Sequence, residues 1–184
     1  GENPAPDAEV RLKSLRADLV RQVEQDDSKD WLTKQINRLP FAYLEGPSTM
    51  HLIDDLRRLK DVSQQAPVAW GRYIEERQVV EYSVGFLENR FRGSFHRLTG
   101  ALSSKGMEIL SAEIHSLADG LCLDRFFVHD LDYSGQPPSS RYDEIETRLV
   151  DSLTAEKFTT PTFRQTWQAR QATQSLNSLP TRVR

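Results

Sequence analysis

The sequence has few of the features that mark secreted or membrane-bound proteins. It holds a single cysteine, Cys122, so no disulfide can form within the chain. No apolar run approaches the roughly 20 residues that span a bilayer. The opening GENPAPDAEV lacks the charged and apolar regions of a secretion signal. These absences predict a soluble, cytoplasmic protein that has no membrane partner.

The sequence also has no large excess of positive or negative charge. The 24 Lys and Arg residues nearly balance the 27 Asp and Glu residues, which leaves a net charge of −3 with both signs interspersed. Such a surface has no field that attracts nucleic acid, so no nucleic-acid partner is expected. The hydrophobic share of 38 % is enough for a folded core. At 184 residues the chain can hold one ordinary domain with a helical appendage, or two small domains.

Recognisable catalytic and cofactor motifs are missing as well. Neither of the two glycine-rich phosphate-binding motifs, G-x-x-x-x-G-K-[ST] and G-x-G-x-x-G, occurs in the sequence. The GSF around Ser94 is not the G-x-S-x-G nucleophile elbow. The four histidines show no metal-ligand spacing, and His129-Asp130 with Asp132 lacks the register of a calcium loop. Cys122 alternates with apolar strand residues and is expected to be packed there. The sequence therefore predicts no catalytic residue, no metal and no cofactor.

The first third of the chain reads as helical. Residues 1–7 are rich in proline and acids and are expected to be disordered. Apolar residues then recur at helical spacing in three stretches, namely 7–25, 29–39, and a third that begins at Ser48 as N-cap. Pro40 ends the second helix, and an irregular FAYLEGP follows it. We expect residues 1–65 to form a helical linker segment.

The pattern changes to strands at Pro67. Residues 68–73 and 78–86 read as a hairpin, and Gly93 opens a helix whose apolar face includes Phe95. In the next strand Leu110, Ala112 and Ile114 face one way, while Ser111, Glu113 and His115 face the other. Asp119-Gly120 signals a tight turn into a partner strand at 121–129.

A helix and a polar tail complete the chain. Ser140 and Asp143 form a possible capping box for a helix that runs to Leu153. The polar tail is expected to be a linker, and its closing PTRVR is expected to form a last strand. The predicted fold is α+β: a helical segment followed by a ferredoxin-like βαββαβ domain over residues 66–184.

One connection has the features of a binding site. Residues 87–95 join a strand to a helix, and Gly93 would let the backbone approach a ligand at the helix N-terminus. Free N–H groups there favour a carboxylate, such as that of an amino acid. Gly93 is equally consistent with a simple turn glycine.

The same region resembles a known family. The run GSFHRLTGALSSKGMEILSAEIHSLADGLCLDRFFVHD resembles an ACT domain, the small-molecule-sensing module of many amino-acid metabolic enzymes. More closely, it resembles the first of two C-terminal ACT domains in bacterial PII uridylyltransferase/uridylyl-removing enzymes. Leu39-Pro40, Tyr43 and His51 resemble that family's LP..Y segment and histidine-bearing helix, and LPTRVR resembles its connector to the second ACT domain. The resemblance covers residues 32–151.

The resemblance implies a regulatory role without catalysis. In that family the uridylyl chemistry resides in nucleotidyltransferase and HD-type domains, whose motifs this chain lacks. The chain would then be an ACT-type module that senses glutamine or another amino acid in nitrogen regulation. Its implied partners are the catalytic domains of the parent enzyme, the PII signal protein and a second ACT module.

The ligand turn departs from the family pattern. That pattern reads Asp-Arg-Pro-Gly-Leu-Phe, where this chain has RFRGSF at 90–95. Gly93 is retained, but Arg90 replaces the acid and Arg92 replaces the proline; the two arginines would repel an ammonium group and attract an anion. The candidate ligand-binding residues are Asn89, Arg90, Arg92, Gly93, Phe95 and Ile109.

Two other functions are consistent with these residues. A structural or protein-interaction module without a small-molecule ligand would explain the two arginines in the turn. A small enzyme of the acylphosphatase kind would need an arginine-bearing phosphate loop and a catalytic asparagine, which Asn89-Arg90 matches only in part.

Overall fold

The helices and strands follow the order expected from the sequence. The computed structural model describes residues 6–44, 51–62, 66–88 and 93–155. Four helices come first: α1 (Pro6–Gln22), α2 (Lys29–Arg38), α3 (Phe41–Leu44) and α4 (Leu52–Leu59). They are followed by β1 (Val68–Ile74), β2 (Val79–Leu87), α5 (Ser94–Ser104), β3 (Met107–Ser116), β4 (Leu121–Asp130) and α6 (Ser139–Thr154).

The strands form one antiparallel sheet in the order β1-β2-β4-β3. This sheet with its helices confirms the predicted α+β, ferredoxin-like class. Strand β2 is paired on both sides, with β1 on one side and β4 on the other. The predicted last strand, PTRVR at residues 180–184, lies outside the described residues, as do the predicted N-cap Ser48 and the polar tail after residue 155.

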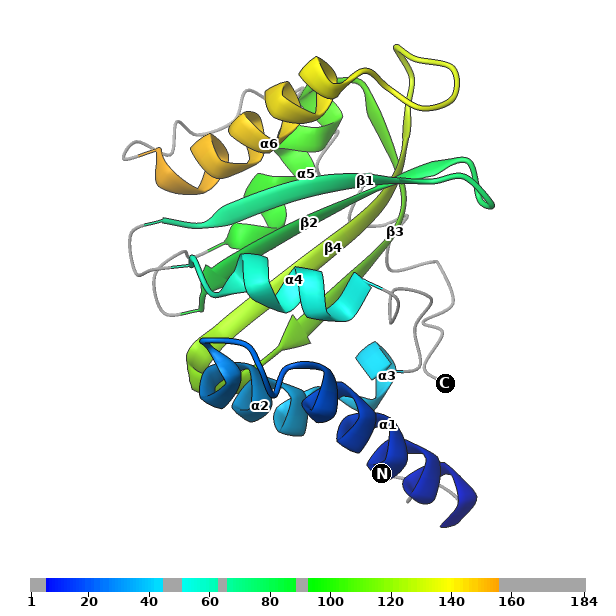
Figure 1. Cartoon of the computed structure of the whole chain (residues 1–184). Coiled ribbons are helices and arrows are strands. Elements are labelled where there is room, and N and C mark those ends of the chain that lie inside the picture. Colours follow the sequence, from blue (N-terminus) through cyan, green and yellow to red (C-terminus); the bar gives the residue numbers. More distant parts are fainter. Residues whose placement is uncertain (1–5, 45–50, 63–65, 89–92, 156–184) are drawn as a thin grey trace.

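Helices α5 and α6 cover one face of the sheet (Figure 1). Because side chains alternate along a strand, every second residue of β2 and β4 points into the core beneath these helices. Ile145, Leu149 and Leu153 of α6 are buried in this core. The remaining buried apolar residues of this core are Val80, Tyr82, Val84, Phe86, Leu98, Ala101, Leu102, Met107, Cys122, Phe126 and Val128.

Helices α1 to α4 lie on the opposite side of the sheet (Figure 1). Their apolar residues form a second core that includes Trp70 of β1 and Leu121 and Leu123 of β4. The sheet is therefore covered on both faces. None of the helices in the described ranges is long and apolar enough to cross a membrane.

Two local expectations, in α3 and α6, differ from the structure. FAYL forms the short helix α3, because the Pro40 carbonyl accepts hydrogen bonds from the N–H groups of Tyr43 and Leu44. The capping box is wrong: Pro138 is the N-cap of α6, so Ser140 lies within the helix and no side chain caps it. His51 is the N-cap of α4.

Strand β3 contains an irregularity that the alternating pattern did not predict. Its register with β4 shifts between Ile109 and Ser111, so Leu110 is an extra residue in the ladder. Beyond the shift, His115 is buried under the N-terminal helices, whereas Ile114 is 62 % exposed. The α1–α4 layer thus covers His115 on the polar side of this strand.

Candidate functional site

The predicted ligand turn leads into the N-terminus of α5. Asn89, Arg90 and Arg92 lie outside the described residues. Gly93 is the N-cap of α5 and has φ 67° and ψ 26°, in the left-handed region that favours glycine. Among the described residues no side chain caps this helix, and a Cβ atom on Gly93 would meet nothing within 4 Å. The first turn of α5 therefore presents N–H groups that no side chain has capped.

Phe95 fixes the position of this first turn over the sheet. Its ring lies 5.7 Å from that of Phe126, measured between centroids. The N–H of Glu88, which precedes α5, donates to the carbonyl of Gly120 just before β4. The N–H of Leu131, just after β4, donates to the carbonyl of Gly106, which follows α5. Helix α5 therefore runs in the same direction as β4, and its N-terminal end lies toward the start of that strand.

Ile109 lies toward the opposite end of α5. It pairs with Val128, which is two residues further along β4 than Phe126. Ile109 and Phe95 both pack against the core beneath α5 and α6. Among the described candidates, Gly93 and Phe95 lie together at the N-terminus of α5. A role for Ile109 in ligand binding stays a prediction.

Asp124 is a residue that the sequence analysis did not single out. It lies on β4 between Cys122 and Phe126, with its side chain on the α5 and α6 face. The residue is 2 % exposed, and its Oδ1 atom has no hydrogen-bond partner in the described part of the chain. Burial raises the pKa of Asp124 to about 7. The available signal was an acid at an inward position in the alternating series 122, 124, 126, 128.

A second polar cluster is buried on the opposite face of the sheet. Arg125 is its centre: Nη2 lies 3.2 Å from Oδ2 of Asp55, and Nε lies 3.0 Å from Oε1 of Glu81. Nη2 also donates a hydrogen bond of 3.1 Å to the hydroxyl of Tyr43. Burial raises the pKa of Tyr43 to about 12, so its hydroxyl stays neutral at physiological pH. This cluster joins α3 and α4 to the sheet.

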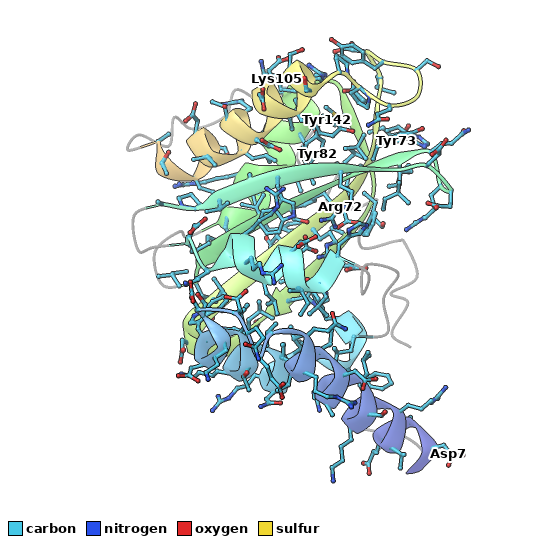
Figure 2. The ribbon with its side chains drawn as sticks, in the orientation of Figure 1. Asp7, Arg72, Tyr73, Tyr82, Lys105 and Tyr142 are labelled. Atoms are coloured by element: carbon cyan, nitrogen blue, oxygen red, sulfur yellow. The ribbon has the colours of Figure 1, made fainter. Side chains whose placement is uncertain are left out.

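Two residues of β1 complete this cluster. Nη2 of Arg72 lies 2.7 Å from Oδ1 of Asp55, and the indole N–H of Trp70 donates to the same oxygen at 3.1 Å. Figure 2 shows Arg72 on the α4 side of β1, and Tyr82 and Tyr142 on the α6 side. Because its charges neutralise one another, the cluster has the chemistry of a structural network rather than of a reactive site.

The histidines do not come together in the described part of the chain. His115 lies 3.0 Å from Oε2 of Glu113, and His129 lies 3.4 Å from Oε2 of Glu108. Within the described ranges no group of three or more His, Cys, Asp or Glu side chains could hold a metal ion. Cys122 is buried, and burial raises the pKa of its thiol to about 11, so a thiolate is disfavoured at neutral pH.

Comparison with curated proteins finds a similarity over part of the chain. Over 67 residues the chain is 40 % identical to the bifunctional uridylyltransferase/uridylyl-removing enzyme of Gluconobacter oxydans (strain 621H). The matched stretch covers 36 % of this chain and 7 % of that enzyme. No protein-family model matches the chain. The similarity supports a relationship to uridylyltransferase/uridylyl-removing enzymes and does not assign a region of the enzyme to this chain.

Proposed function

We propose that this chain is a regulatory, non-catalytic portion of a uridylyltransferase-like enzyme. In this role it is an ACT-type module that senses an amino acid, with glutamine as the expected ligand. The catalytic domains of the parent enzyme and the PII signal protein are its proposed partners, in the cytoplasm. Pairing of two such modules is part of the same proposal.

The observation that carries this proposal is the uncapped N-terminus of α5. Its N-cap, Gly93, has left-handed dihedral angles and open space where a side chain would be. A helix N-terminus carries partial positive charge and unpaired N–H groups, which suit the carboxylate of an amino acid. The similarity to a uridylyltransferase/uridylyl-removing enzyme supports a relationship to that kind of parent enzyme.

Calorimetric titration of the full chain tests the proposal. L-glutamine is the probe, with L-glutamate and glycine as comparison ligands. Gly93→Val should abolish binding, because a β-branched residue disfavours left-handed angles and would displace the helix N-terminus. Gly135→Val is a matched control, since Gly135 has φ 76° and equally open surroundings, but lies in the loop before α6.

The outcomes separate sensing from a purely structural role. Saturable heat with L-glutamine that Gly93→Val removes and Gly135→Val preserves would support the proposal. No heat with any of the three ligands would refute amino-acid sensing by this chain. Equal binding by the two variants would refute the assignment of the site to the N-terminus of α5.

A protein-interaction module without a ligand is the second candidate. It is favoured by β3, which lies at one edge of the sheet and carries the exposed side chain of Ile114. An edge strand can pair with a strand of another chain, and an apolar side chain adds contact area. Sedimentation velocity at increasing protein concentration tests this role. A monomer at every concentration would contradict self-association through β3, which Ile114→Lys should otherwise weaken.

A further inference from the structure

The strand register places Asp124 toward the N-terminal end of α5. Phe95, in the first turn of this helix, stacks on Phe126, and Asp124 precedes Phe126 by two residues on the same face of β4. Because α5 runs in the same direction as β4, the position of Asp124 falls on the side toward which the first N–H groups of the helix point. The carboxylate and the helix terminus therefore belong to one locality.

The two groups have opposite character, and no side chain in the described residues satisfies either of them. The helix terminus has no side-chain cap, and Oδ1 of Asp124 has no hydrogen-bond partner. Burying a carboxylate without a partner is unfavourable, and such groups in native proteins call for an explanation. Asp124 also breaks the apolar pattern of β4, and local violations of this kind concentrate at functional sites.

The helical cover of the sheet ends between Asp124 and β3. Ile114 is directly opposite Asp124 in the β3–β4 ladder, so the two side chains lie on the same face of the sheet. Ile114 is largely exposed while Asp124 is buried, so the layer of α5 and α6 covers Asp124 but does not cover Ile114. A small ligand could thus enter over β3.

We propose that Asp124 and the first turn of α5 form a binding site for a zwitterion of the size of an α-amino acid. Asp124 accepts hydrogen bonds from the ammonium group, and the N–H groups of α5 donate to the carboxylate. An acid on β4 thereby supplies the negative charge that RFRGSF at 90–95 does not. This inference rests on the proposed function, because it names the residue that would recognise the amino group of the sensed ligand.

Calorimetry with two variants and two glutamine analogues tests the assignment. Asp124→Asn keeps the shape of the side chain and removes its charge; Asp119→Asn is the control, since Asp119 is an exposed acid of the same hairpin that pairs with Lys34. The analogues are 4-carbamoylbutanoate, which lacks the amino group, and 4-aminobutanamide, which lacks the carboxylate. The unaltered chain of 184 residues and both variants are compared at one pH and salt concentration.

Asp124→Asn should weaken L-glutamine binding about tenfold or more, whereas Asp119→Asn should leave it unchanged. For 4-carbamoylbutanoate the Asp124→Asn change should have little effect, since that ligand has no ammonium group to lose. Wild type should bind both analogues more weakly than glutamine. This comparison needs wild type alone, so it tests the site even if Asp124→Asn does not fold.

Two results would overturn the inference in distinguishable ways. Undiminished glutamine binding by Asp124→Asn, or equal wild-type affinity for glutamine and 4-carbamoylbutanoate, would remove Asp124 from the site and leave amino-acid sensing in place. Absence of binding by wild type for glutamine, glutamate and glycine would refute both this inference and the proposed function.

Discussion

Replacement of Arg125 by methionine tests how the N-terminal helices are held on the sheet. The Arg125 guanidinium bonds to Asp55, Glu81 and Tyr43 and is 2 % exposed. Methionine replaces the unbranched stem of the arginine side chain and removes the charged guanidinium. Arg125→Met therefore leaves two buried carboxylates without their shared cation.

The loss can be estimated from the contacts that remain. Removing one partner of a buried ion pair destabilises a protein by roughly 3–5 kcal/mol. Arg72 still pairs with Asp55 at 2.7 Å and lies 3.5 Å from Glu81, and the indole N–H of Trp70 still bonds to Asp55. We therefore expect the lower end of the range, about 3 kcal/mol in the free energy of unfolding.

Urea unfolding followed by circular dichroism measures this loss. Arg57→Met is a suitable control, because Arg57 pairs with Asp26 at 3.0 Å but its side chain is half exposed, and exposed pairs contribute about 1 kcal/mol or less. A loss below about 1 kcal/mol for Arg125→Met would refute the view that this network holds the helices on the sheet. Adding Asp55→Asn to Arg125→Met should recover part of the loss, since Arg72 then faces one buried carboxylate, that of Glu81, instead of two.

Three further predictions concern the α5 and α6 face. Burial raises the pKa of Asp124 from 3.8 to about 7, so between these pH values the folded chain holds a proton that the unfolded chain has lost. The free energy of unfolding should therefore fall as pH rises from 4 to 7, by at most about 4 kcal/mol. Asp124→Asn should flatten this pH dependence, measured by urea unfolding at each pH. Cys122 should react with a thiol reagent only after unfolding, and rapid native-state labelling would contradict its burial. Gly71→Ala should lower the melting temperature, because its Cβ would lie 2.6 Å from ring atoms of Tyr142 and Tyr82; an unchanged temperature would contradict this packing.

Local sequence signals predicted most of the elements. The Asp119-Gly120 turn is specified by two residues that both adopt positive φ, at 62° and 75°. The start of α5 follows from Gly93, and the strands follow from alternation. The predicted capping box failed because proline at 138 sets the start of α6 one residue before Ser140, and a residue inside a helix cannot cap it.

The covering of the second face of the sheet could not be predicted. Glu81, Arg125 and His115 have the polar character of solvent-facing strand positions, and they are buried only because distant helices bring Asp55 and Tyr43 over them. Pairings across 70 or more residues leave no periodicity in the sequence. An isolated charge on an inward face is visible in the sequence, as at position 124, but its burial and its missing partner depend on the packing of α5.

The most direct test of the central claim is to locate the binding site by NMR. Amide spectra of the ¹⁵N-labelled chain are recorded during titration with L-glutamine. The account predicts saturable shifts concentrated at Ser94, Phe95 and His96 in the first turn of α5 and at Asp124 on β4. No shifts at saturating glutamine, or shifts confined to the α1–α4 side of the sheet, would contradict it.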